Sequence, residues 1–290
     1  MDVFSRSWKV TKLSFGVIKK DKELYFYPIL SFFVSLLFII VLGIISILGG
    51  LFVLNNGEAA ITAFGYLVLF IAYFGIAFIG TFFSVSIVYT AGMRFSGKDA
   101  TFGESLGFSF KRIPKIFLWS AVSATVGLIL KVIENGAQKT KGVGGAVLMI
   151  SKSLLGLAWA IATVFVIQGI VYKELGPFKS IKESVHILNK TWGESLIRYI
   201  GFGLVEFLFV LVGIIVAVPL FFLGATFGLF GILIIVGILF LYLLAVGLTF
   251  GLASQVYNTA LYVYANTGKV PDGYDKDSMV HAFKIQNRAF

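Results

Sequence analysis

The 290-residue sequence contains no cysteine, two histidines and few charged residues. The absence of cysteine excludes disulfide bonds, thiolate nucleophiles and cysteine metal ligands. His186 and His281 are too few to build a metal centre by themselves. Charged residues make up 13% of the chain, about half the share that is usual in soluble domains. We therefore expect no metal or other cofactor, and the shortage of charge argues against a water-soluble protein.

Apolar residues are abundant instead. They make up 58% of the sequence, which includes 31 phenylalanines and 32 glycines, and the mean hydropathy is +0.95. Phenylalanine suits surfaces that face lipid, and glycine suits close contacts between membrane helices. This composition predicts an all-α integral membrane protein, because a helix satisfies its own backbone hydrogen bonds inside a bilayer.

Six segments are long and apolar enough to cross a membrane, which takes about 20 residues. They lie near residues 28–54, 59–88, 114–133, 154–172, 197–222 and 229–253. NNGE (55–58) marks a turn between the first two. The stretch from Tyr199 to Ala253 would be about 80 Å long as one helix, so we expect it to fold back at GATFGLFG (224–231). The sequence thus predicts six transmembrane helices in three hairpins.

An amphipathic segment precedes each predicted hairpin. In residues 176–190 the lysines fall largely on one helical face. The opposite, apolar face comprises Phe178, Ile181, Val185 and Leu188. Residues 101–113 show a similar pattern and begin with a Thr101–Glu104 capping box, and the first 20 residues are also amphipathic. We predict that each segment is a helix lying at the membrane interface.

One amphipathic segment followed by two spans occurs three times, which suggests an internal repeat. The expected units cover about residues 1–93, 94–174 and 175–267 of a single transmembrane domain, 1–267, followed by a cytoplasmic tail, 268–290. A serine and a lysine recur at one spacing, as Ser14 and Lys20, Ser105 and Lys111, and Ser184 and Lys190. Three similar loops without a common origin remain an alternative.

Basic residues are distributed unevenly between the two sides of the predicted topology. Of the 24 lysines and arginines, 20 fall in the N-terminal segment, two connections between hairpins and the C-terminal tail. The other side holds Lys131, Lys139, Lys141 and Lys152. Because basic residues concentrate in cytoplasmic loops, we expect a cell-membrane protein with both termini in the cytoplasm. The N-terminal sequence MDVFSRSWKV lacks the pattern of a signal peptide, so we expect none.

The net charge of +10 has a simple interpretation in a membrane protein. Lysine and arginine next to a membrane attract anionic lipid head groups, so we expect lipids and no nucleic acid as partners. The predicted head-group contacts are Lys19, Lys20, Lys111, Arg112, Lys179, Lys182 and Lys190. A homo-oligomer is compatible with the sequence.

Glu206 is the single charged residue between Tyr199 and Ala253. A charged acid near the middle of a bilayer costs at least about 2.5 kcal/mol, so this side chain is expected to face other helices. It would either be protonated and donate a hydrogen bond, or titrate through a water-filled path. The predicted intramembrane polar site consists of Glu206, Gln168, Ser84, Ser86 and Arg198.

Several stretches together resemble a known protein family over nearly the whole chain. They are FSRSW (4–8), DKELYFYP (21–28), SATVGLIL (123–130), LGLAWAIATVFV (155–166), LGPFKSIKESVHILNKTWGESL (175–196) and ALYVYANTG (260–268). The chain resembles an uncharacterised family of prokaryotic multi-pass membrane proteins, distantly similar to the membrane domain attached to some glycerophosphodiester phosphodiesterases. The resemblance implies a membrane fold, and it implies no catalytic residues.

The predicted spans lack the groups that catalysis requires. They hold no paired carboxylates and no histidine motif that could activate a nucleophile or water. We therefore predict a non-enzymatic protein, with a lipid-active enzyme less favoured. Two classes remain, namely a transporter or channel with a polar path near Glu206, and a membrane-organising or lipid-binding scaffold.

Overall fold

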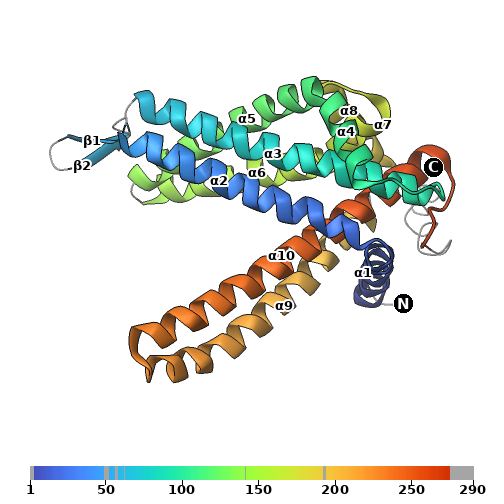
Figure 1. The fold of residues 1–290 in the computed structure, drawn as a ribbon. Helices are drawn as coiled ribbons and strands as arrows, with labels where there is room; N and C mark the ends of the chain where they lie inside the picture. Colours follow the sequence, from blue (N-terminus) through green and yellow to red (C-terminus); the bar gives the residue numbers. More distant parts are fainter. Residues whose placement is uncertain are drawn as a thin grey trace. The chain divides into compact units, whose positions relative to one another are not determined.

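The computed structural model describes residues 3–48, 52–55, 58–61, 63–140, 142–191 and 194–274. Within these ranges the chain is almost entirely helical (Figure 1). The helices are α1 (Val3–Lys20), α2 (Phe26–Leu48), α3 (Ala63–Phe95), α4 (Phe102–Lys111), α5 (Ile113–Lys139), α6 (Val143–Ala162), α7 (Val166–Lys173), α8 (Pro177–Thr191), α9 (Glu194–Ala225) and α10 (Gly228–Thr267). A short 3-10 helix, η1 (Lys22–Tyr25), connects α1 to α2.

Six helical segments of the described chain are long and apolar enough to cross a membrane, which confirms the predicted number. They are Lys22–Leu48, Phe64–Phe95, Ile113–Lys139, Val143–Lys173, Gly203–Ala225 and Gly228–Thr267. The predicted turn within residues 224–231 is also confirmed, since α9 ends at Ala225 and α10 begins at Gly228.

The prediction of an all-helical chain misses one short β-hairpin. The predicted first span continued to residue 54, but α2 ends at Leu48. Strand β1 (Phe52–Asn55) then pairs antiparallel with β2 (Glu58–Ile61), with Asn55 opposite Glu58. The two residues between the strands read Asn-Gly, the pair that most favours a two-residue hairpin loop. The apolar residues on either side therefore belong to strands and not to spans.

The chain divides into two compact units. The central unit comprises residues 27–90 and 99–187, and the terminal unit comprises residues 1–26, 91–98 and 188–290. In the central unit the long helices α2, α3, α5 and α6 run side by side (Figure 1). The β-hairpin lies at one end of these helices, and α4, α7 and α8 lie at the opposite end. The predicted boundaries of the three repeats stay a prediction.

The fourth predicted span is broken near its middle. A single helix was expected over residues 154–172, but α6 ends at Ala162 and α7 begins at Val166. The Thr163 hydroxyl donates to the Trp159 carbonyl oxygen, and the Val164 amide donates to the Ile161 carbonyl oxygen. These local bonds replace part of the helical ladder, so the break leaves the next amide, that of Phe165, in need of another acceptor.

The terminal unit is built on the antiparallel pair α9 and α10, and α1 contacts both helices. The Tyr242 hydroxyl of α10 donates to the Phe209 carbonyl oxygen of α9 at 2.8 Å. Its ring lies directly over Gly213, where any larger side chain would overlap it. Near the turn, Gly224 and Gly231 let the two backbones touch. Glycine therefore sets the close approach of these two helices.

A second pair of glycines in α10 makes no close contact among the described residues. Gly247 and Gly251 form a GxxxG pattern in α10, but both are exposed and a Cβ at either position would meet no atom within 4 Å.

Candidate functional site

Helix α8 presents three kinds of side chain on different faces. Its buried face comprises Ser180, Ser184, Ile187 and Leu188. Lys179 and Lys182 are exposed, and Phe178 beside them is 76% exposed. The predicted apolar face is thus divided, because Leu188 packs inside the protein while Phe178 points away from it. The buried face thus carries two hydroxyls among apolar residues, and an exposed aromatic residue lies beside the lysines.

Ser184 explains how the polar face of α8 is stabilised. Its Oγ accepts a hydrogen bond from the backbone amide of Phe165 at 3.0 Å. Both residues are fully buried, and the break between α6 and α7 removes the usual helical acceptor for this amide. The serine therefore gives this buried backbone donor an acceptor.

Helix α4 is attached to α3 in a similar way, through a buried group of hydroxyls. We call it the hydroxyl cluster, and its members are Tyr27, Ser86, Thr90, Ser105 and Ser109. Thr90 Oγ1 lies 2.7 Å from Ser105 Oγ and 3.2 Å from Tyr27 Oη. Ser86 Oγ lies 2.7 Å from Ser109 Oγ. These hydrogen bonds hold one face of α4 against α3, so Lys111 and Phe110 remain on the exposed surface.

The capping box that was predicted at the start of α4 is confirmed. Glu104 Oε2 accepts from the Thr101 amide at 2.8 Å, and Thr101 Oγ1 accepts from the Glu104 amide at 3.3 Å. The hydrogen bonds from Thr101, first from its backbone and then from its side chain, hold the pKa of Glu104 below its usual value.

In the terminal unit, α1 is held by a third buried serine. Ser14 Oγ lies 2.9 Å from the hydroxyl oxygen of Tyr274, which follows α10. Both side chains are buried, and burial raises the pKa of Tyr274. The serines at the repeated sequence position, Ser14, Ser105 and Ser184, are thus all fully buried and all bonded to a residue outside their own helix.

The predicted head-group contacts differ in their surroundings. Five of them are exposed, namely Lys19, Lys20, Lys111, Lys179 and Lys182. Arg112 is instead 17% exposed and pairs with Glu174 at 2.7 Å. Its guanidinium also lies 4.6 Å from the centre of the Phe108 ring. This ion pair joins the start of α5 to the end of α7, so the charge of Arg112 is already paired within the protein. The side chain of Lys190 lies outside the described residues.

The predicted polar site is distributed over both units. Glu206 is partly buried in α9, and in the described part of the chain no hydrogen bond or ion pair to its carboxyl is present. The side chain of Arg198 lies outside the described residues. Gln168, Ser84 and Ser86 belong to the central unit, where Gln168 is buried in α7 and Ser86 is part of the hydroxyl cluster. The association of these five residues stays a prediction.

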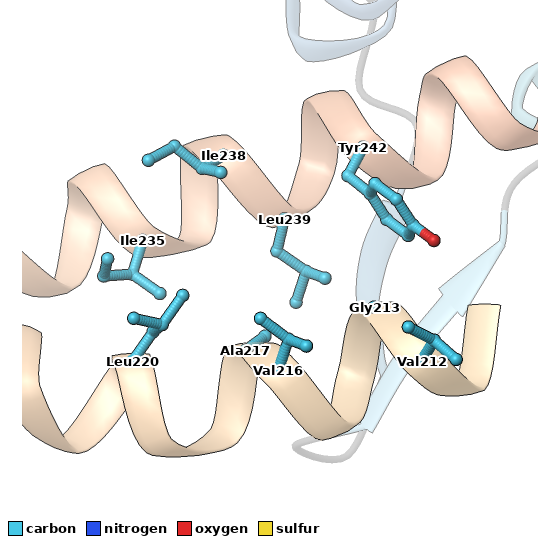
Figure 2. Close-up of a pocket in the computed structure, with 9 residues that line it drawn as sticks. All are labelled: Val212, Gly213, Val216, Ala217, Leu220, Ile235, Ile238, Leu239 and Tyr242. Atoms are coloured by element: carbon cyan, nitrogen blue, oxygen red, sulfur yellow. The ribbon is translucent and has the colours of Figure 1, made fainter. Parts of the chain in front are cut away.

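A groove between α9 and α10 is almost wholly apolar (Figure 2). It has a volume of about 180 Å³ and is lined by Val212, Gly213, Val216, Ala217, Leu220, Ile235, Ile238, Leu239 and Tyr242. The Tyr242 hydroxyl at one end is used in the bond to Phe209. The lining offers hydrocarbon to an occupant and no polar path.

One group of charges was not predicted, and it joins the C-terminal part of α5 to the middle of α6. Glu134 pairs with Lys131 at 3.0 Å and with Lys152 at 2.7 Å. Both lysines were counted on the side poor in basic residues, but nothing in the sequence indicates that one glutamate joins them. Among the described residues no group of three histidine, aspartate or glutamate side chains is placed to hold a metal ion.

Comparison with known proteins gives a family. A search of curated proteins finds no match. Residues 63–272 match the model of a family of unknown function, DUF6159. This segment runs from the start of α3 to beyond the end of α10, which is more than half of the chain. The chain therefore belongs to this family of unknown function.

Proposed function

We propose that this chain is a non-enzymatic, multi-pass membrane protein that binds and organises anionic lipids at one leaflet. The amphipathic helices α1, α4 and α8 would lie at the interface and hold the head groups. The observation that supports this most is the arrangement of α8, where Phe178 is exposed beside Lys179 and Lys182 while the serines face the protein.

Each part of that arrangement suits a membrane interface. Phe178 would place its ring among the upper acyl chains, and the two lysines would extend their apolar stems and reach the phosphates. Helix α4 repeats the pattern with Phe110, which is 61% exposed, next to Lys111. Each lysine near an anionic surface contributes about 1 kcal/mol of attraction. Several such helices would concentrate anionic lipids around the protein.

The proposal includes an orientation in the cell membrane, with both termini cytoplasmic, and it rests on the distribution of basic residues. Because the chain has no cysteine, single cysteines report accessibility without background. Cysteines at Lys139 and Thr226 should react with an impermeant thiol reagent added outside cells, whereas those at Lys20 and Lys111 should not. The reverse labelling pattern would contradict the orientation.

Lipid binding is tested with the double variant Lys179→Gln/Lys182→Gln. We expect the variant to retain anionic phosphatidylglycerol about fivefold less well per lysine, which corresponds to about 1 kcal/mol each. The measurement is native mass spectrometry of protein purified with phosphatidylglycerol or phosphatidylcholine. Lys139→Gln removes an exposed lysine elsewhere and serves as the control. Equal retention by the variant, the control and the wild type would disprove the proposal.

A transporter or channel is the second candidate, and it rests on Glu206. This carboxyl is partly buried in an apolar hairpin without a partner in the described residues, and intramembrane carboxyls often carry protons or bind cations. Glu206→Gln keeps the shape of the side chain but cannot ionise. Proton or cation flux into liposomes, compared between wild type and variant from about pH 5 to 8, decides the matter. Absence of flux in both proteins excludes this function.

The family relationship also has a finer form that we propose. The chain would be a distant relative of the membrane domain that accompanies some glycerophosphodiester phosphodiesterases, and this proposal rests on the sequence stretches quoted above. If so, the shared element is a lipid-organising membrane domain without the phosphodiesterase chemistry. The lipid-retention experiment applied to such a domain would show whether the property is common to both.

A further inference from the structure

We propose that Lys131 and Lys152 form a binding site for the phosphate of an anionic membrane lipid, and that Glu134 positions the two ammonium groups. We call these three residues the lysine–glutamate triad. The triad lies in the central unit, on the side of the predicted topology opposite to the basic helices α4 and α8. It is therefore separate from the head-group contacts proposed above, and it does not depend on them.

The geometry of the triad leaves donors available. Glu134 Oε1 accepts from Lys131 Nζ at 3.0 Å, and Glu134 Oε2 accepts from Lys152 Nζ at 2.7 Å. Each ammonium group carries three N–H donors and uses one of them on the carboxylate. The two lysine side chains are 34% and 31% exposed, so the remaining donors can reach an anion at the surface.

The charge of the triad favours an anionic ligand. Two lysines and one glutamate sum to a net charge of about +1, and all three side chains are partly buried. Lys152 alone would already pair Glu134 and join α5 to α6. Lys131 adds a second positive charge that is partly removed from water, and another anion could neutralise it. A phosphodiester supplies one negative charge and would bring the group to neutrality.

The depth of the triad matches a lipid phosphate. Lys131 lies 19 residues beyond Arg112 along α5, which corresponds to about 28 Å of helix. Lys152 lies in the apolar segment Val143–Lys173, 21 residues before Lys173, and its ion pair with Glu134 places it close to the level of Lys131. The hydrocarbon core of a bilayer is about 30 Å thick. With the basic ends at one interface, both lysines reach the level of the phosphates in the opposite leaflet.

The surroundings of the triad favour a lipid over free phosphate. Exposed apolar side chains lie on the same two helices next to the lysines, namely Ile129, Val132, Leu154 and Leu155. An acyl chain attached to the phosphate could lie along these residues and bury apolar surface, from which inorganic phosphate would gain nothing. The ligand is therefore a phospholipid with a net negative charge.

The test measures how much added lipid raises the temperature of unfolding of the full-length protein in detergent. The ligands are phosphatidylglycerol, phosphatidylcholine and inorganic phosphate, each titrated separately. The variants are Lys131→Gln and Lys152→Gln, and Lys139→Gln on α5 is the matched control. We expect phosphatidylglycerol to bind about fivefold more weakly to each triad variant, which is about 1 kcal/mol per lysine, and unchanged to the control.

A purely structural role would give a different result. If the triad only joins α5 to α6, its variants lower the unfolding temperature equally with and without phosphatidylglycerol, and the proposal is overturned. Equal stabilisation of the wild type by inorganic phosphate or phosphatidylcholine would overturn the lipid assignment. Glu134→Gln breaks the ion pairs that position both lysines, so we expect lower stability and weaker phosphatidylglycerol binding. Unchanged binding would overturn the positioning role of Glu134.

The two lipid proposals can fail separately. The variant Lys179→Gln/Lys182→Gln is titrated in the same assay. In this variant, the triad substitutions should reduce the stabilisation by phosphatidylglycerol as much as they do in the wild type. If only the α8 variant weakens lipid binding, the triad proposal fails and the proposed function stands. If only the triad variants do so, the opposite conclusion follows.

Discussion

Replacing Ser184 with alanine should destabilise the protein more than its small size suggests. The Phe165 amide lies in the break between α6 and α7 and donates to Ser184 Oγ at 3.0 Å. Both residues are fully buried, so no water can replace the lost acceptor. A buried donor left without a partner costs about 1–3 kcal/mol. We expect a loss of that size in the free energy of unfolding.

The same helix offers a matched control. Ser180 lies one turn earlier on α8 and is also fully buried, but its hydroxyl has no hydrogen-bond partner among the described residues. Ser180→Ala removes an unsatisfied polar group, so we expect it to be neutral or stabilising. The two variants differ in the hydrogen bond and not in burial or in the atoms removed.

The measurement is reversible unfolding of the protein in detergent micelles, followed by circular dichroism for wild type and both variants. Hydrogen exchange at the Phe165 amide gives a second readout, and it should become faster in Ser184→Ala alone. Equal stability of the two variants would refute the reasoning, because it would show that the Phe165 amide finds another acceptor. A larger loss in Ser180→Ala would refute it as well.

Two further predictions concern α9 with α10 and the start of α4. Gly213→Ala should push the Tyr242 ring away and break its hydrogen bond to Phe209, which should lower the free energy of unfolding by about 1–3 kcal/mol. The control is Gly247→Ala, where the added methyl group meets no atom, so we expect it to be neutral or stabilising. Because the pKa of Glu104 is lowered in the folded state, its contribution to stability should be present above its unfolded pKa and lost as the pH falls through the lowered value. Thr101→Ala should return the pKa of Glu104 toward its usual value in a carboxyl NMR titration, and an unchanged pKa would contradict the capping-box explanation.

The long helices were predictable because their signal is local and strong. Runs of about 20 apolar residues and the turn at residues 224–231 can be read without knowledge of any tertiary contact. The β-hairpin was missed because short apolar strands and the end of an apolar helix look alike in composition. The Asn-Gly pair between the strands was the available signal, and it was interpreted only as a turn.

The break in the fourth span has no comparable local signal. Neither proline nor glycine lies within residues 162–166, and apolar residues continue through the break. The buried acceptor that stabilises it, Ser184, lies 19 residues later on another helix. Likewise, nothing in the sequence shows that Glu134 joins Lys131 to Lys152, because the two lysines lie on different helices. Such features depend on tertiary contacts and could not be predicted from one sequence.

The buried serines give the strongest support for the predicted internal repeat. If the three amphipathic segments were unrelated, nothing would require a polar residue to be buried at the same position in each. Yet Ser14, Ser105 and Ser184 are all fully buried. Each bonds to a residue in or after the second span of the repeat that precedes its own, and for Ser14 in the first repeat that is the third repeat and the residues that follow it. Their partners are the Tyr274 hydroxyl, the Thr90 hydroxyl and the Phe165 amide. The partners differ in chemistry, so what is shared is the position of the serine and the direction of the contact. A common ancestor unit that bonded to a neighbouring copy of itself would explain both, since each copy could then change its partner group while the buried hydroxyl still required one.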